Sequence, residues 1–141
     1  MQTFLPYSDF ELSAKVLDRQ RLGKQRVETL QIAKALITPE YGWQQHPAVK
    51  MWRGHLGALL CYQQAICNEW TGRGYKDTCL DKTTELLRYE RLTTPPWLGN
   101  EKFHLSHQSN LLRKLPEHYS KYFLGVPNDL EYVWPGEEVA V

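Results

Sequence analysis

The chain has 141 residues, of which 42% are hydrophobic and 23% are charged, and its formal net charge is +1. This length and composition are typical of one globular domain with its own core, and they exclude a mainly disordered chain. No apolar run approaches the roughly 20 residues of a membrane-spanning helix, and no charged-then-apolar leader opens the chain, so we expect a non-secreted, cytoplasmic protein that does not bind membranes.

The spacing of apolar residues predicts an all-α protein that forms a single compact domain over residues 1–141. A capping-box pattern, in which Glu11 follows Ser8 by three positions, opens a first long helix. The helical pattern continues to about Ile37, and Gly23 marks a possible break within it. No stretch alternates between apolar and polar residues as a strand would.

A second long helix is predicted to begin near Pro47, because proline suits the first turn of a helix. It should end at the glycines of residues 72–74, since glycine adopts the left-handed conformation that closes many helices. Shorter helical stretches are predicted over residues 79–89, over residues 106–115 and from Pro116 onwards. Residues 125–141 are aromatic without regular spacing, so we expect an irregular tail there.

Cysteine and histidine could in principle form a metal site. Cys61, Cys67 and Cys79 contain no CxxC pair, which favours reduced and mostly buried thiols. His104 and His107 have His-x-x-His spacing, but no cysteine or acidic residue completes a familiar ligand set. We therefore interpret these histidines as hydrogen-bonded or surface residues, and we expect no metal and no cofactor.

Positive charge concentrates on the first long helix, and residues 125–141 contain no Lys or Arg. Glu28 shares a helix face with Arg21 and Lys24, which precede it by seven and four positions. Five basic residues form a cluster in this region, namely Lys15, Arg19, Arg21, Lys24 and Arg26.

Two interpretations of this helix face remain open. It could be the solvated side of a helix, with surface ion pairs that contribute little to stability. It could instead bind phosphates, with a carboxylate among the cations. A carboxylate repels phosphate, so its presence indicates a chemical role, such as stabilising positive charge while a sugar–base bond breaks.

Three segments together resemble the pyrimidine-dimer DNA glycosylases of the phage endonuclease V type. The first is the pattern of Leu17, Asp18, Leu22 and Glu28 on the first helix. The second is Glu-Trp-Thr-Gly-Arg-Gly-Tyr-Lys-Asp-Thr over residues 69–78, and the third covers residues 106–123. The resemblance extends over residues 1–124, and the tail from residue 125 lies outside it.

The resemblance implies an all-α enzyme without a metal, which flips a nucleotide and attacks the sugar C1′ with its own terminal amine. The essential glutamate of the first helix falls on Glu28. Because Gln2 is bulky, we expect Met1 to be retained and to supply the amine. An α-amine has a pKa of about 7.7–8.0 against about 10.4 for lysine, so it is far more often neutral and nucleophilic at neutral pH.

On this interpretation the substrate is damaged double-stranded DNA, bound by a monomer. Phosphates would be held by the basic residues of the first helix, namely Arg19, Arg21, Lys24 and Arg26. The extruded base would stack on an aromatic residue. Trp43 and Trp52 are the candidates, although Trp52 suits the core better.

Two further hypotheses stay open at this point. The chain could be a helical module that binds DNA through its basic helix and performs no chemistry. It could also be a glycosylase for another modified base or nucleoside, since a scaffold does not fix the substrate.

Overall fold

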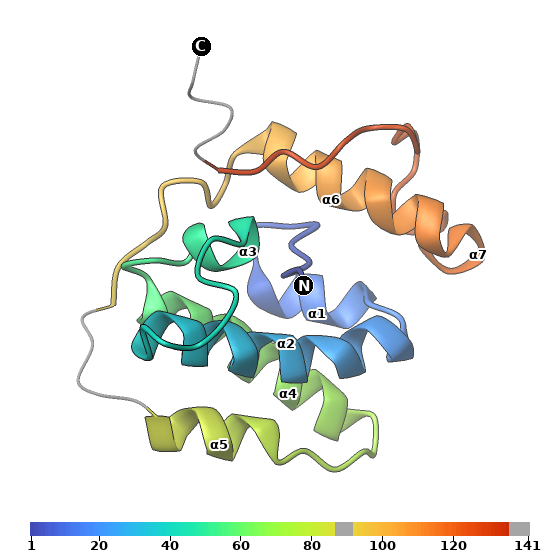
Figure 1. Ribbon diagram of the computed structural model, residues 1–141. Coiled ribbons are helices and arrows are strands. Elements are labelled where there is room, and N and C mark those ends of the chain that lie inside the picture. The colour runs from blue at the N-terminus through green and yellow to red at the C-terminus, as the bar shows by residue number, and fades with distance from the viewer. Residues whose placement is uncertain (87–91, 136–141) are drawn as a thin grey trace.

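The computed structural model describes residues 1–86 and 92–135, and within these ranges it contains helices and no strand (Figure 1). The predicted all-α fold is therefore confirmed. The helices are α1 (Phe10–Val16), α2 (Arg19–Ile37), α3 (Pro47–Lys50), α4 (Leu56–Gly72), α5 (Cys79–Leu86), α6 (Glu101–Lys114) and α7 (Pro116–Tyr119).

The first predicted long helix is two helices, and both its start and its break differ from the prediction. The Asp9 carboxylate, not the Ser8 hydroxyl, caps α1 by accepting from the Leu12 N–H at 3.1 Å. The chain breaks at Asp18, whose carboxylate caps α2, and not at Gly23. Gly23 lies inside α2, where an added Cβ would approach the Trp70 ring to 3.1 Å. A glycine at this position therefore allows the Trp70 ring to pack closely against α2.

The second predicted long helix is also divided. The short helix α3 starts at Pro47 as predicted, but a turn interrupts it before α4. Gly54 in that turn has a φ of +84°, a conformation that side-chain-bearing residues rarely adopt. The predicted end at residues 72–74 is confirmed, and Gly74 has a φ of +98°.

The later helices follow the prediction with different limits. The stretch predicted over residues 79–89 is helical to Leu86, and its last residues lie outside the described ranges. Helix α6 begins at residue 101 rather than 106, because the Asn100 side chain caps it by accepting from the Phe103 N–H at 3.1 Å. The described part of the tail is irregular, as expected, and runs back along α6 (Figure 1).

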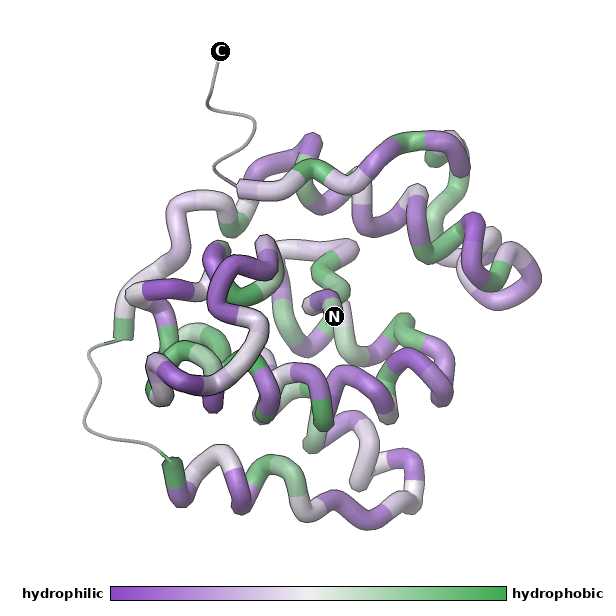
Figure 2. The backbone as a smooth tube through the Cα atoms, viewed as in Figure 1, coloured by the Kyte–Doolittle hydropathy of each residue, from purple (hydrophilic) through white to green (hydrophobic). Residues whose placement is uncertain are grey.

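Helix α2 packs against α4 and α5, while α1 packs against α4. Between α2 and α6 the first residues of the chain run through the interior without forming a helix or a strand (Figure 1). Leu5 in this segment is fully buried, as are Trp52, Tyr62 and Phe103. Hydrophobic and hydrophilic residues are interspersed along the helices (Figure 2). None of the described helices has the length and apolarity needed to cross a bilayer.

Candidate active site

Side chains, rather than a partner strand, hold the backbone of the N-terminal segment. The Gln25 Nε2 donates to the Gln2 carbonyl at 2.7 Å, and the Gln25 Oε1 accepts from the Phe4 N–H at 2.9 Å. The Tyr62 hydroxyl donates to the Phe4 carbonyl at 2.7 Å. Gln25 and Tyr62 are fully buried. These bonds satisfy backbone groups that would otherwise be buried without partners.

His104 and His107 hold the next residue, Leu5, through both of its backbone groups. The Leu5 N–H donates to the His107 Nδ1 at 3.0 Å, and the His104 Nδ1 lies 2.8 Å from the Leu5 carbonyl. A carbonyl only accepts, so the His104 Nδ1 carries a proton, and its Nε2 accepts from the Gly99 N–H at 2.9 Å. The two rings therefore hold opposite tautomers.

Burial lowers the pKa of His107 to about 3 and lowers the pKa of His104 as well. Both rings are thus neutral, as their hydrogen bonds require. The His-x-x-His pair is a clamp for the N-terminal segment, in line with the sequence interpretation of hydrogen-bonded histidines. Within residues 1–86 and 92–135, no three His, Cys, Asp or Glu side chains gather as a metal site would require.

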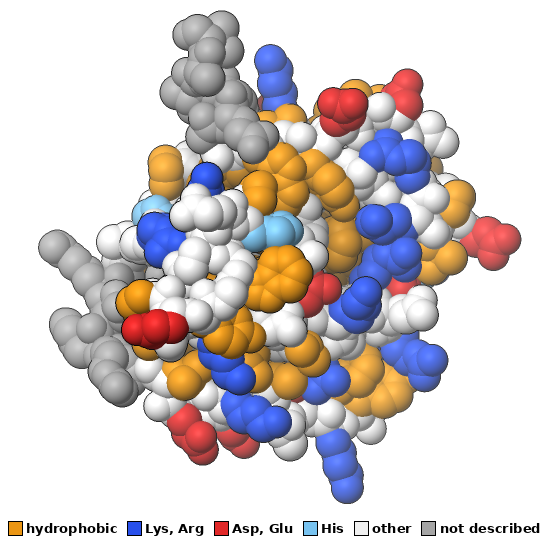
Figure 3. All heavy atoms as spheres, viewed as in Figure 1, with side chains coloured by type: hydrophobic (Ala, Val, Ile, Leu, Met, Phe, Trp, Pro, Cys, Tyr) orange, Lys and Arg blue, Asp and Glu red, His pale blue; other side chains and the backbone are white. Residues whose placement is uncertain are grey.

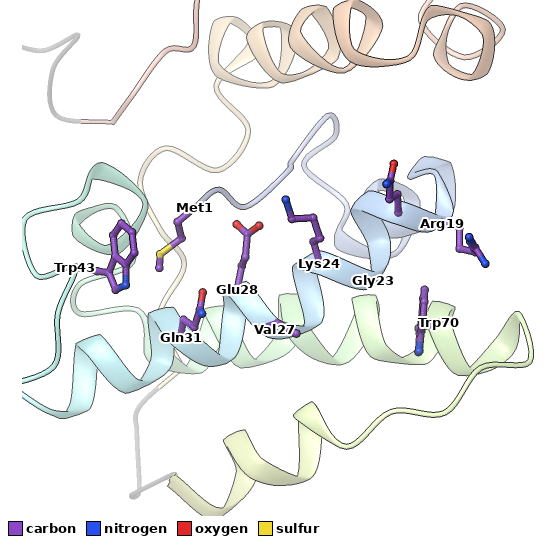
Figure 4. Close-up of a pocket in the computed structure, with 10 residues that line it drawn as sticks. Met1, Arg19, Gly23, Lys24, Val27, Glu28, Gln31, Trp43 and Trp70 are labelled. Atoms are coloured by element: carbon purple, nitrogen blue, oxygen red, sulfur yellow. The ribbon is translucent and has the colours of Figure 1, made fainter.

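The clamped segment places the start of the chain beside Glu28. The Gln2 N–H donates to the Glu28 Oε2 at 2.6 Å, so the carboxylate lies next to the peptide that joins Met1 to Gln2. Figure 4 shows Glu28 pointing from α2 toward Met1, with Lys24 one turn away on the same side. The structure brings together the two residues that the sequence assigned to catalysis.

Two surface hollows meet at this position. The first, of 540 Å³, contains Trp43, Trp70 and Val27 and is largely apolar. The second, of 480 Å³, is more polar and contains His46, Tyr132 and Trp134. The residues that line both hollows are Met1, Gln20, Lys24 and Glu28.

Three of the four predicted phosphate ligands lie at these hollows. Arg19 lines the first, Lys24 lines both, and Arg21 lines the second while it pairs with Asp18 at 3.2 Å. Lys114 of α6 adds a further cation to the second hollow. On the face seen in Figure 3, Lys and Arg side chains lie to the right of and below a central group of hydrophobic side chains. Among the residues that the structure describes, Glu28 is the only acid that lines either hollow.

Arg26 is the exception, because the structure places it away from both hollows. Its guanidinium pairs with Asp77 at 2.7 Å and lies 4.4 Å from the centre of the Trp70 ring. Burial acts to raise the pKa of Asp77, but the hydrogen bond from Arg26 keeps it below its ordinary value. Position 26 is about 200° from position 28 around a helix, so its side chain faces α4 and α5 rather than Glu28.

The two candidate tryptophans have different surroundings. Trp43 is 53% exposed at the first hollow, and its φ of +74° is unusual for a residue with a side chain. Trp52 is fully buried, and its Nε1 donates to the Thr3 hydroxyl at 3.1 Å. Trp52 is therefore a core residue, and Trp43 is free to stack on a ligand.

Several residues of these hollows carry no signal in the sequence that would mark them as part of a site. They lie far from Glu28 in the sequence, so no local motif that contains Glu28 includes them. Burial raises the pKa of one of them, Tyr132, to about 12, so it presents a neutral hydroxyl. These residues are His46, Trp70, Lys114, Tyr132 and Trp134.

The sequence of the chain matches one known protein family. The family described as pyrimidine dimer DNA glycosylase matches residues 1–83, more than half of the chain. The chain belongs to this family. No curated protein and no solved structure was found to match it.

The family makes this protein a DNA repair glycosylase, with DNA as its substrate. The matched residues contain the N-terminal segment, Glu28 and the basic face of α2. Helix α6 and the tail, which complete the clamp and the second hollow, lie beyond the match.

Proposed function

We propose that the protein releases damaged pyrimidines from duplex DNA, with the Met1 amine as nucleophile and Glu28 as the group that moves protons. The observation that carries this proposal is the hydrogen bond from the Gln2 N–H to the Glu28 Oε2 at 2.6 Å. It ties the first peptide of the chain to a carboxylate where two hollows open to solvent.

In the proposed reaction the Met1 nitrogen forms a bond to C1′ of the damaged nucleotide. The C1′–N1 bond breaks, and its electron pair leaves with the base, which takes a proton from water. The new secondary ammonium gives one proton to the Glu28 carboxylate. That proton passes to O4′ as the C1′–O4′ bond breaks, and a protonated imine joins Met1 to the opened sugar.

Strand cleavage is a second step of the same proposal. The imine draws electrons from C2′, so removal of a C2′ proton expels the phosphate bound at C3′. Glu28 is the nearby group that can take this proton, because it returns to its carboxylate form once it has protonated O4′. The reaction then needs no metal and no further nucleophile.

The two hollows support a flipped nucleotide as the bound species. The first hollow is apolar along Val27, Trp43 and Trp70, which suits the faces of a base. Arg19 and Lys24 border it, which suits the phosphates on either side. The Glu28 carboxylate repels the phosphates and so weakens DNA binding. A catalytic role for this carboxylate explains its presence.

Borohydride reduction tests the proposal directly. Incubation with abasic duplex and borohydride should join the protein covalently to DNA, and mass mapping should locate the bond on the residue 1 nitrogen. Glu28→Gln should bind the same duplex, because its amide oxygen still accepts from Gln2, but should lose base release and trapping. Glu117→Gln, an exposed change on α7, is the matched control. A bond on a lysine, or full activity of Glu28→Gln, would overturn the assignment.

A further inference from the structure

His46 occupies the position directly before α3 and lines the second hollow together with Met1 and Glu28. Its Nδ1 accepts a hydrogen bond from the Ala48 N–H at 3.0 Å, so the ring caps the helix. The proposed reaction assigns no role to this residue, although it stands beside both reacting groups.

The cap fixes the tautomer of the ring. A nitrogen that accepts from an N–H carries no proton, so the proton of a neutral His46 is on Nε2. Burial, followed by the charge of the terminal amine, lowers the pKa of His46, while Glu28 acts in the opposite direction. The ring is therefore neutral at neutral pH, and its Nε2–H is a hydrogen-bond donor.

Two aromatic rings fix the orientation of this imidazole. Trp43 packs edge-to-face against it at 5.7 Å between ring centres, and Trp134 does so from the tail at 6.3 Å. Among the described residues no protein acceptor bonds to Nε2 of His46. A donor that is fixed in tautomer and orientation, and left open at a hollow, is suited to a ligand.

We propose that His46 is a further catalytic residue. A base that stacks on Trp43 in the first hollow lies where that hollow meets the second, since Met1 and Glu28 line both and Trp43 packs on His46. From this border the Nε2–H of His46 donates to the carbonyl oxygen of the pyrimidine as that base leaves. This inference rests on the proposed function. When the C1′–N1 bond breaks, the electron pair spreads from N1 onto the carbonyl oxygen beside it. A positioned donor stabilises that charge more in the transition state than in the substrate. The proton stays on His46, and the base takes its proton from water.

The capping role of His46 has to be separated from this catalytic role. Asparagine is among the preferred residues before a helix, and its side-chain oxygen can accept from the Ala48 N–H. His46→Asn therefore keeps the cap, and because its side chain is shorter than that of histidine, its amide N–H does not reach the position of the Nε2–H. His55→Asn is the matched control, since His55 directly precedes α4 and lines neither hollow.

The experiment compares two substrates for each variant. Ultraviolet-irradiated duplex still carries the base, so its cleavage includes base departure. A preformed abasic duplex has no base to lose, so borohydride trapping on it reports the Met1 amine and Glu28 alone. We expect His46→Asn to slow base release by roughly 100-fold or more, the usual effect of removing one such donor. Trapping on abasic DNA and thermal unfolding should match the wild type and His55→Asn.

Each other outcome has a defined meaning. Base release by His46→Asn at the wild-type rate overturns the role of His46 and leaves the proposed function intact. Equal slowing on both substrates also overturns it, because His46 then acts on the amine or on the fold rather than on the base. If the wild-type protein itself releases no base, the proposed function fails and this inference fails with it.

Discussion

Gln25 and Glu28 lie one turn apart on α2 and hold opposite sides of the same residue, Gln2. Glu28 accepts from the Gln2 N–H at 2.6 Å, and Gln25 donates to the Gln2 carbonyl at 2.7 Å. Spacing of three residues on a helix brings two such side chains to one face. Glu28, the proposed catalytic carboxylate, and Gln25, which positions the first residues of the chain, are therefore held by the same helix.

Replacing Gln25 tests the clamp. Gln25→Ala should lower the free energy of unfolding by about 2–6 kcal/mol, because the Gln2 carbonyl and the Phe4 N–H would stay buried without partners, at about 1–3 kcal/mol each. Urea denaturation measures this change. Gln20→Ala, at an exposed position of α2, should change stability by no more than about 0.5 kcal/mol. A similarly small effect of Gln25→Ala would contradict the role of the clamp.

Salt dependence distinguishes the basic residues of α2. Lys24→Gln and Arg19→Gln should each reduce the slope of log affinity against log salt by about 0.9, the value for one lost phosphate contact. Arg26→Gln should leave the slope unchanged, since Asp77 and Trp70 hold that guanidinium inside the protein. It should instead cost about 2 kcal/mol of stability, because Asp77 loses a charged partner. Binding titrations at several salt concentrations separate these patterns, and a reduced slope for Arg26→Gln would contradict the structure.

Acid should destabilise the protein through His107. Burial lowers the pKa of this ring from its ordinary 6.5 to about 3, so between these pH values the unfolded chain binds a proton that the folded chain does not. Stability is therefore retained above pH 6.5 and is lost as the pH falls. Between pH 7.5 and 4.5 the loss should be about 2–3 kcal/mol.

The control for this pH effect is His107→Gln, whose side-chain oxygen can accept from the Leu5 N–H but does not titrate. Urea denaturation at pH 7.5 and 4.5 should show a smaller acid-induced loss in the variant than in the wild type. Equal losses in the two proteins would mean that other groups cause the acid sensitivity.

Trp43 should show opposite effects on stability and on binding. Its φ of +74° is strained for a bulky side chain but not for glycine, so Trp43→Gly should unfold at the same or a higher temperature. The variant should bind lesion-containing DNA more weakly by about 1–3 kcal/mol, the contribution of one aromatic–base stack. Trp43→Phe keeps a ring and should retain most of the affinity. Unchanged affinity in the glycine variant would exclude Trp43 from the interface.

The amino-acid sequence alone was enough to predict most of the helical segments, the family and the two residues proposed to react. Apolar spacing and caps are local, which is why residues 10–37 and 47–72 could be recognised as helical. Their divisions at Asp18 and Gly54 were missed, since a capping aspartate and one glycine are weak signals within a continuing helical pattern. Glu28 and Met1 could be proposed because the motif and the chain start are both visible in the sequence.

The assembly of the candidate site depends on tertiary contacts between distant parts of the chain. Leu5 meets His104 and His107 across about a hundred residues, and Trp134 reaches His46 from the tail. Such contacts depend on how helices pack, and no spacing along the chain encodes them. Arg26 is a different case, because helical spacing alone places it far around α2 from Glu28, and the tertiary structure adds only its partner, Asp77.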